Sequence, residues 1–240
     1  AATEGLLAES ALIAHGRGEA FNYLLGEATS DSALMAIKHA AAVMNSANNC
    51  VISVNGNAVA LAAADLIRCA AVLQCPVEIN IYYRTPERMV ALYSKLETVK
   101  AEVMLSKPPV GWQGDWKVAV NSVSILGAEP NGRIPNLEGP RANCCKEGIL
   151  EADVIFVPLE DGDRCEALMD MGKTVIVVDL NPLSRTAKMA TITIVDELMR
   201  MTPLLLSHLV NSSDGKPNIE WDNQMILDSA LRVMLSRLEE

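Results

Sequence analysis

The densest group of chemically active side chains lies in the segment AHGRGEAFNYLLGE, residues 14–27. It sets His15, Arg17 and Glu19 among apolar residues, with a glycine on either side of Arg17. Small neighbours let a ligand approach, and a guanidinium grips a phosphate or carboxylate through two parallel hydrogen bonds. We therefore predict that Arg17 contacts an anionic ligand. The structural alternative is an ion pair with the acidic loop at 160–163.

A second candidate is the acidic turn PLEDGDR, residues 158–164, which follows an apolar run. Carboxylates grouped at such a place hold Mg²⁺ or orient an arginine that binds an anion. For Asp163 the cap of a helix N-terminus is an equal alternative, because the helix dipole favours an acid there. The turn therefore predicts a magnesium site at Asp161 and Asp163, with capping left open for Asp163.

The segment DLNPLSR, residues 179–185, ends a third apolar run. An aspartate such as Asp179 can accept hydrogen bonds from a ribose or an adenine amine, while Arg185 reaches phosphate. Standard nucleotide motifs are absent: Gly172-Lys173-Thr174 lacks the earlier P-loop glycine, and Gly16-Arg17-Gly18 lacks the third glycine of a dinucleotide fingerprint. Any bound phosphates must therefore meet arginines and helix N-termini.

The elements that would position these groups are strands and helices that alternate along the chain, and each kind is indicated by the spacing of its apolar residues. Short β-branched apolar runs indicate strands, and capped stretches with helical spacing indicate helices. Strands are expected at 50–54, 77–83, 102–105, 153–158, 174–179 and 191–196. Helices are expected from about 31 to 48, at 58–73, after Thr85, near Asp163, Ser184 and Glu197, and at about 219–238. This alternation predicts an α/β fold with a doubly wound, mostly parallel sheet of about six strands and flanking helices.

Ligands of such sheets bind beyond the carboxyl ends of the strands. Most of the expected strands are followed there by polar residues, which together outline a polar rim on one edge. Residues 106–148 break the rhythm and are rich in Pro, Gly and Asn. We interpret them as an irregular excursion of one domain, residues 1–240, that covers part of the site.

Composition excludes several classes of protein. The chain is 50% hydrophobic and 21% charged, which is not the composition of a disordered protein. A net charge of −10 argues against nucleic acids and anionic lipid surfaces as partners. Asp65 and Arg68 interrupt the longest apolar stretch, so no membrane span is expected, and AATEGLLAES lacks the basic start of a signal peptide. The six cysteines form no Cys-x-x-Cys and do not cluster with the histidines, which favours reduced thiols in the cytoplasm over a zinc site.

An ordered series of motifs carries a family resemblance: AHGRGEAFNYLLGE, VISVNGN, INIYYRT, RIPNLE, ADVIFVPLEDGDR, DLNPLSR and ITIVDEL. The series resembles the archaeal phosphopantothenate synthetases (4-phosphopantoate–β-alanine ligases) over about residues 10–205. The resemblance implies a Rossmann-like homodimer of coenzyme A biosynthesis. Such an enzyme joins 4-phosphopantoate to β-alanine with ATP and Mg²⁺, through a phosphopantoyl adenylate, and releases AMP and pyrophosphate.

The resemblance also implies site residues. The ATP contacts carried over are Arg17, Asp179, Leu180, Asn181, Arg185, Thr186, Glu197 and Leu198. Candidates for 4-phosphopantoate, from their places at the sheet edge and in the excursion, are Asn55, Asn57, Arg84 and Arg133. His15 and Glu19 are the candidates for the base that deprotonates the amine of β-alanine.

The sequence departs from the family pattern at four places, one of which is Cys165, a residue that is not part of the family's motif. The family has an additional N-terminal helical segment that contributes an arginine to ATP, and this chain begins after it, so we expect an incomplete ATP site or a substitute residue. The connection at 107–132 looks longer than the family's, and Asn22 stands where an aspartate is expected.

Two other functions are compatible with the residues alone. One is a Rossmann-like protein that senses a nucleotide without catalysis. The other is a magnesium-dependent hydrolase or phosphotransferase that uses the carboxylates of 160–163. Only the ligase requires β-alanine, so product analysis separates the three.

Overall fold

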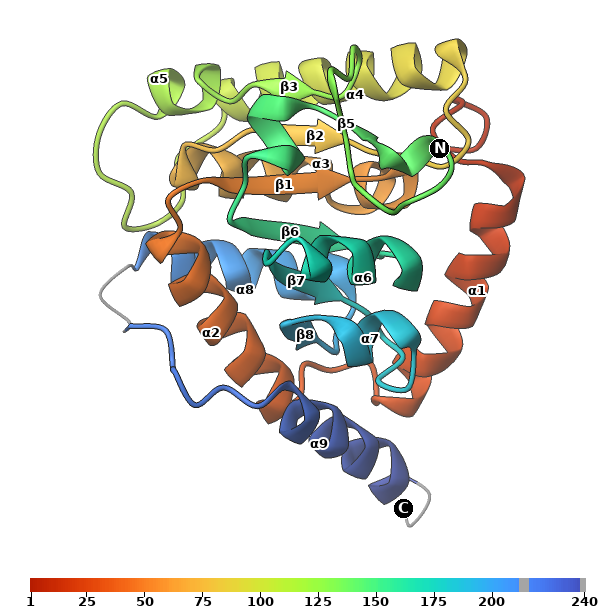
Figure 1. The fold of residues 1–240 in the computed structure, drawn as a ribbon. Helices are drawn as coiled ribbons and strands as arrows, with labels where there is room; N and C mark the ends of the chain where they lie inside the picture. The colour runs from red at the N-terminus through yellow and green to blue at the C-terminus, as the bar shows by residue number, and fades with distance from the viewer. Residues whose placement is uncertain (212–215, 238–240) are drawn as a thin grey trace.

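The computed structural model describes residues 1–211 and 216–237 and is built around a six-stranded sheet (Figure 1). All of its strand pairs are parallel, and the strand order is β3-β2-β1-β6-β7-β8. Counted along the chain this is 3-2-1-4-5-6, the order of the Rossmann fold, so the expected α/β architecture is confirmed. The strands are β1 (Cys50–Val54), β2 (Val77–Ile79), β3 (Ile125–Leu126), β6 (Val154–Pro158), β7 (Thr174–Val178) and β8 (Ile192–Ile194).

Both faces of the sheet are covered, which is why its strands read as continuous apolar runs. Ile52, Phe156 and Ile176 belong to the larger core, on the face with α2, α3, α4, α5 and α8. Val51 and Ile155 belong to the core on the other face, with α6, α7 and the excursion. The helices are α2 (Asp31–Ser46), α3 (Gly56–Leu73), α4 (Pro86–Leu105), α5 (Trp116–Asn121), α6 (Gly162–Asp170), α7 (Arg185–Met189) and α8 (Leu198–Val210).

The helices that follow strands begin with a capping side chain. Each cap accepts a hydrogen bond from a backbone N–H in the first turn of its helix and so satisfies a donor that has no partner within the helix. The caps are Asn55 for α3, Thr85 for α4, Asp161 for α6, Ser184 for α7 and Glu197 for α8. These turns therefore bring polar side chains to the carboxyl edge of the sheet. The cap of α6 is Asp161, so the capping alternative considered for Asp163 is wrong.

One expected strand is wrong. Residues 102–105 form the last turn of α4, whose buried Leu92, Leu96, Val99 and Val103 are spaced at helical intervals. Val103 continues the helical period of the buried residues, and Ser106 ends the helix. The third strand of the sheet is instead β3, inside the excursion, and its two residues are too short to show a period in the sequence.

The excursion at 106–148 is therefore partly regular. Besides α5 and β3 it contains a small antiparallel pair, β4 (Gly132–Arg133) with β5 (Asn143–Cys144), and the short helix η1 (Pro140–Ala142). It leads into η2 (Lys146–Leu150). Glu78, buried in β2, accepts hydrogen bonds from the backbone N–H of Cys145 and Ile149, both at 2.8 Å. These bonds fasten the end of the excursion to the sheet.

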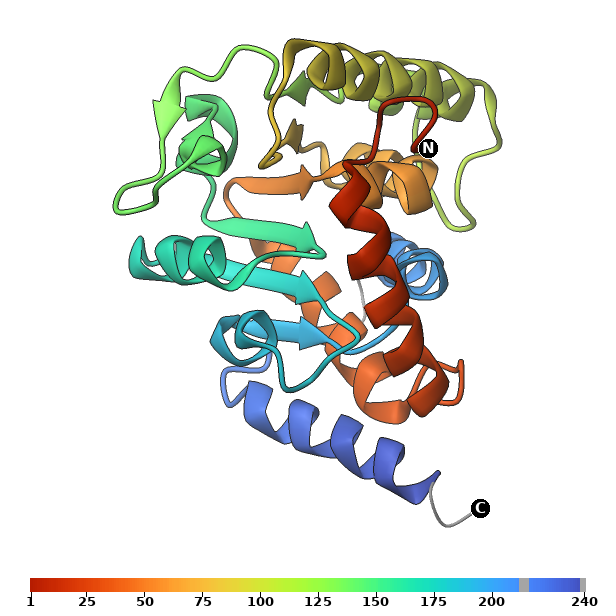
Figure 2. The same cartoon turned by 90° about the vertical axis from the view of Figure 1, so that its right-hand side faces the viewer.

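Helix α1 (Glu9–Leu24) stands across the carboxyl ends of the strands (Figure 2). None of its residues is buried, but Leu6 and Leu25, just beyond its two ends, are 2% and 1% exposed. The helix is therefore anchored at its ends and open along its length. The last helix, α9 (Asn223–Ser236), packs Leu227 and Met234 against Leu25; the end of its expected range, residue 238, lies outside the described residues.

Among the described helices, α3 is long and apolar enough to cross a membrane by length and composition. Its Leu66 and Ile67 are fully buried in the core between the sheet and its neighbouring helices. The core helix of a globular domain has this composition too, and α3 lies in that position.

Candidate functional site

Two cavities open between α1 and the carboxyl edge of the sheet. The first, of about 660 Å³, is lined by four arginines and is called the arginine cavity: Arg17, Arg88, Arg141 and Arg185. The second, of about 510 Å³, has apolar walls and is called the leucine cavity: Phe21, Leu61, Leu159, Leu180 and Leu198. Ala14, Arg17 and Asn57 line both. The two cavities are therefore adjacent and meet at Arg17.

The leucine cavity collects most of the residues singled out in the sequence. From α1 and the segments after β1, β7 and β8 it receives His15, Arg17, Glu19, Asn57, Asp179, Leu180, Asn181, Thr186, Glu197 and Leu198. These residues are far apart in the chain, and the parallel sheet brings them together because each follows or faces the carboxyl end of a strand. Apolar walls with a few polar groups suit a flat, partly polar ligand such as a nucleoside.

Asp179 lies at the end of β7 with both carboxylate oxygens engaged. Oδ1 accepts a hydrogen bond from the backbone N–H of Asn181 at 2.9 Å, and Oδ2 accepts one from the Ser184 hydroxyl. Burial raises the pKa of this carboxyl above its ordinary value, and the two hydrogen bonds offset part of the rise. Carboxylate oxygens carry further lone pairs, so Asp179 can still accept from a ligand hydroxyl or amine.

The end of the leucine cavity beside β8 rests on a second buried carboxylate. Asp196 is 1% exposed and accepts hydrogen bonds from Thr29 Oγ1 at 2.6 Å and from Arg200 Nε at 2.8 Å. Arg200 also donates from Nη2 to the amide oxygen of Asn22 at 2.9 Å. Asn22 therefore supplies the same acceptor that the aspartate expected from the family pattern would supply, so the asparagine fits at this position.

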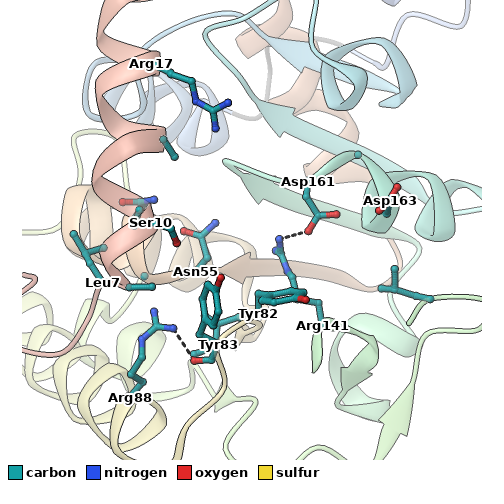
Figure 3. Close-up of a pocket in the computed structure, with 18 of the residues that line it drawn as sticks. Leu7, Ser10, Arg17, Asn55, Tyr82, Tyr83, Arg88, Arg141, Asp161 and Asp163 are labelled. Carbon is teal, nitrogen blue, oxygen red and sulfur yellow. Dashed lines mark hydrogen bonds and ion pairs between the residues drawn. The ribbon is translucent and has the colours of Figure 1, made fainter. Parts of the chain in front are cut away.

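The arginine cavity carries cations in very different settings (Figure 3). Arg17 is exposed on α1 and, within the described residues, has no hydrogen-bond or ion-pair partner. The predicted alternative, an ion pair with the acidic loop, is therefore not formed. Arg88 donates to the carbonyls of Tyr83 at 2.6 Å and Leu6 at 3.0 Å, and burial lowers its pKa. It holds the start of the chain onto α4.

Arg141 comes from the excursion, and sequence reasoning did not select it. Its Nε donates to Asn80 Oδ1 at 3.2 Å, and its Nη1 donates to Glu160 Oε1 at 2.7 Å and to Asp161 Oδ2 at 2.6 Å. Asn80 lies 61 residues earlier in the chain. No local spacing links Arg141 to these partners, so only the folded chain shows that it belongs to the site.

The acidic turn after β6 is divided between two arginines. Asp161 accepts from Arg141 and, as the cap of α6, from the Arg164 backbone N–H at 2.9 Å. Although its burial acts in the opposite direction, Arg141 and these bonds hold its pKa below the usual value. Asp163 and Glu166 form surface ion pairs with Arg185, whose side chain is 57% exposed. Exposed pairs contribute little to stability, so Arg185 can exchange them for a ligand.

The two aspartates do not form a complete metal site. Within residues 1–211 and 216–237, no group of three His, Cys, Asp or Glu side chains is arranged to hold a metal ion. Mg²⁺ takes six oxygen ligands and usually keeps waters or substrate phosphates among them. A magnesium ion at Asp161 or Asp163 would therefore need oxygens from a bound nucleotide.

Of the predicted substrate-binding residues, Asn55 and Asn57 line the arginine cavity, and Arg84 and Arg133 line neither cavity. Arg84 donates to the carbonyls of Gly127 and Ala128. Arg133 donates to Asn143 Oδ1 and to the Leu137 carbonyl, both at 3.2 Å. Both arginines fasten the excursion rather than face the site.

Lys173 lies directly before a strand, as the sequence predicts, and not at the start of a helix, where a P-loop lysine lies. It is 9% exposed and immediately precedes β7, and its Nζ donates to the carbonyls of Leu150 at 2.8 Å and Ala152 at 2.6 Å. The lysine therefore holds backbone at the amino edge of the sheet, opposite the cavities.

Comparison with known proteins agrees with this geometry. The model of the phosphopantothenate/pantothenate synthetase family matches residues 32–113 and 116–237. A 4-phosphopantoate–β-alanine ligase of Thermococcus onnurineus (strain NA1) is 46% identical over 200 residues, which cover 83% of this chain and 69% of that protein.

Two further proteins of the same name are similar along their length. The one from Thermococcus kodakarensis (strain KOD1) is 42% identical over 246 residues, covering 99% of this chain and 87% of that protein. The one from Methanospirillum hungatei JF-1 is 43% identical over 196 residues, covering 82% and 71%. The chain belongs to the phosphopantothenate/pantothenate synthetase family.

Proposed function

We propose that this protein joins 4-phosphopantoate to β-alanine at the expense of ATP. In this reaction the carboxylate of 4-phosphopantoate attacks the α-phosphate, which gives a phosphopantoyl adenylate and pyrophosphate. The neutral amine of β-alanine then attacks the acyl carbon, an amide bond forms, and AMP leaves. The relatives carry the name of this ligase, and the same reaction is implied by the resemblance of the motifs.

The observation that carries the proposal is the junction of the two cavities. Adenylation requires an acyl carboxylate and an α-phosphate to meet in line, so a nucleotide site must open directly into a site for an anionic acid. The leucine cavity suits the nucleoside, the arginine cavity suits the phosphorylated acid, and they meet at Arg17. Arg17 has no partner among the described residues and can bind the α-phosphate as charge develops on it.

The roles of the nucleotide-binding residues follow from their positions. Leu180 and Leu198 would enclose the base with Glu197 beside it, and Asp179 and Asn181 would bind the ribose or the base amine. Arg17 and Arg185 would bind the triphosphate, with Thr186 at the start of α7.

For 4-phosphopantoate we propose Arg141 as the principal cation, with Asn55 and Asn57 beside it. Two of the three guanidinium nitrogens of Arg141 are bound by protein side chains. Its Nη2 is not enclosed and has no partner among the described residues, so it remains available to a ligand oxygen. Such a charge-assisted bond suits the dianionic phosphate of this acid.

His15 and Glu19 are the proposed alternatives for the base that accepts the proton of β-alanine. Both lie one turn apart on α1 and line the leucine cavity. The carboxylate of Glu19 already accepts the Tyr23 hydroxyl at 3.0 Å. The variants His15→Asn and Glu19→Gln discriminate between them, because loss of the base slows β-alanine-dependent product formation while pyrophosphate exchange continues.

We propose that Mg²⁺ enters as the counter-ion of the ATP phosphates and that Asp163 contacts it when Arg185 moves to the nucleotide. The supporting observation is the exposed, exchangeable pairing of Asp163 with Arg185. Asp161 is committed to Arg141 and to the cap of α6, so its contribution would be to position these groups.

We also propose a cytoplasmic homodimer. Four large apolar side chains of α1 face solvent: Leu12, Ile13, Tyr23 and Leu24, with 57%, 68%, 59% and 42% exposure. Their spacing places them along one side of the helix, which suits a second copy of the chain. Replacing Ile13 with Glu should convert the dimer to a monomer in sedimentation experiments; an unchanged mass would exclude α1 as the interface.

The deciding experiment is a product assay with ATP and 4-phosphopantoate, with and without β-alanine. The ligase forms 4′-phosphopantothenate and AMP only when β-alanine is present, and it exchanges labelled pyrophosphate into ATP without it. A hydrolase needs no amine, and a sensor forms no product. Stoichiometric ADP and inorganic phosphate would overturn the adenylate route.

A further inference from the structure

The turn between β6 and α6 lies between the two cavities and holds a charge network centred on buried side chains. The side chains of Glu160 and Arg164 are both 0% exposed, and that of Arg141 is 10% exposed. Charges are expensive to bury unless each is paired and hydrogen-bonded. Such a network at the wall of a substrate cavity therefore needs an explanation in terms of what it holds in place.

Glu160 is the centre of this network. Its Oε1 accepts from Arg141 Nη1 and from the Asp161 backbone N–H, each at 2.7 Å, and its Oε2 accepts from Arg164 Nη1. Arg164 donates in turn from Nη2 to the Ser53 hydroxyl at 2.8 Å, which ties the cluster to β1. The carboxylate thus links an arginine of the cavity wall to an arginine of the core.

The backbone around Glu160 is equally constrained. Leu159 has a φ of +60°, a left-handed conformation that is uncommon for leucine and persists only when the surroundings impose it. Asn55 Nδ2 donates to the Leu159 carbonyl at 2.9 Å, and Thr186 Oγ1 donates to the Glu160 carbonyl at 3.1 Å. The position of the Glu160 carboxylate is therefore fixed from both sides of the sheet edge.

We propose that Glu160 is a positioning residue that aims Arg141 at the acid substrate. Glu160 and Asp161 hold Nη1, Asn80 holds Nε, and only Nη2 is left to face the arginine cavity. A guanidinium fixed in this way binds an oxyanion without first losing rotational freedom. Glu160 lines only the leucine cavity, and its contacts with Arg141 and Arg164 occupy its carboxylate, so it acts through Arg141 rather than on substrate.

This inference rests on the proposed function, and the test uses the whole protein with ATP, 4-phosphopantoate and β-alanine. Glu160→Gln keeps the size of the side chain but removes the charge and one acceptor. We expect the KM for 4-phosphopantoate to rise about tenfold and the KM for ATP to stay within about twofold, as for loss of one charge-assisted contact. Glu151→Gln, which breaks an exposed pair with Lys146, is the matched control and should change neither.

A double-mutant cycle with Arg141→Lys separates positioning from a general structural role. If Glu160 acts through Arg141, Glu160→Gln should change the KM for 4-phosphopantoate by less than about twofold in the Arg141→Lys background. Equal effects in both backgrounds, or parallel losses for both substrates, would overturn the proposal. If Glu160→Gln does not fold, Asp161→Asn takes its place: it keeps the α6 cap and should give a smaller rise of the same KM.

The outcomes for the wild-type protein keep the two proposals apart. A wild-type protein that forms no β-alanine-dependent product from 4-phosphopantoate and ATP defeats the proposed function itself. If the wild-type protein is active and Glu160→Gln leaves both KM values unchanged, only the positioning role of Glu160 is contradicted.

Discussion

The arginines around the two cavities are held in opposite ways. Arg141, in the arginine cavity, is almost buried and is fixed at Nε and Nη1 by three side chains. Arg17 and Arg185, which would serve the nucleotide, are exposed; the first has no partner among the described residues and the second has only surface ion pairs. One set is rigid before a ligand arrives, and the other is free to move.

This difference matches what each ligand requires. A small acid offers few atoms, so affinity for it depends on groups that are already in place. A triphosphate brings its own charge, length and magnesium ion, and mobile arginines can follow it through attack and departure of pyrophosphate. We infer that the arginine cavity sets specificity for the acid and that the mobile arginines serve the chemistry at the α-phosphate.

The largest effect should follow from removing the fixed arginine. Arg141→Leu deletes the cation and leaves Asp161 without its partner, and we expect kcat/KM for 4-phosphopantoate to fall about a hundredfold, a loss of roughly 2.7 kcal/mol. Affinity for ATP, measured by calorimetry, should change by less than about threefold because the leucine cavity does not contain Arg141.

Arg133→Leu is the comparison that sharpens this prediction. Arg133 belongs to the same excursion and was expected from the sequence to bind substrate, but its guanidinium donates to Asn143 and Leu137. Its effect on kcat/KM should be at least about tenfold smaller than that of Arg141→Leu. A larger loss of kcat/KM for Arg133→Leu than for Arg141→Leu would mean that Arg133, and not Arg141, contacts the substrate.

Arg17→Ala should affect both cavities, because Arg17 lines both. Affinity for ATP should fall at least about tenfold, which is what a charge-assisted contact of about 1.5–3 kcal/mol supplies. The melting temperature should not change, since no residue of α1 is buried. Arg232→Ala, on the exposed side of α9, is the control; equal ATP affinity in the two variants would remove Arg17 from the nucleotide site.

Asp179→Asn tests whether the buried Asp179 carboxylate lowers the stability of the fold while it contributes to nucleotide binding. Because burial raises the Asp179 pKa, the folded state takes up a proton more readily than the unfolded chain, and the ionised carboxyl destabilises the fold. This destabilisation is complete above the raised pKa, decreases as the pH falls through it, and is absent below the unfolded value of about 4. The variant should therefore melt no lower than wild type at pH 7, and the difference should vanish in acid.

The same variant should bind ATP more weakly, by about fivefold, because an amide oxygen is a poorer acceptor than a carboxylate. Thermal melts at pH 7 and pH 4, with ATP calorimetry at pH 7, measure both effects. A variant that melts lower at pH 7 and binds ATP normally would mean that Asp179 only supports the turn with Asn181 and Ser184.

The two cavities also differ in how far the sequence predicts them. On the nucleotide side, the strand ends and helix caps, such as Asp179 and Ser184, have places that follow from local period and capping signals, whereas helix α1 was not predicted. The acid side depends on Arg141, which meets Asn80 and Glu160 only through the tertiary fold of a segment without a period. The strand wrongly expected at 102–105 has a different cause, because a run of three apolar residues after Glu102 fits either period.

The smallest predicted effect concerns Mg²⁺ and the exposed ion pair of Asp163 with Arg185. If Asp163 leaves Arg185 to contact the ion, Asp163→Asn should raise the Mg²⁺ concentration for half-maximal turnover about threefold, since an amide oxygen is a weaker ligand than a carboxylate. Stability should be unchanged, because the pair it breaks is exposed and the cap of α6 is Asp161. The control is Asp170→Asn, at the last residue of the same helix and outside both cavities. A magnesium titration of Asp163→Asn that coincides with wild type and control would show that the ion is held by the nucleotide alone, and that Asp163 only restrains Arg185 until ATP arrives.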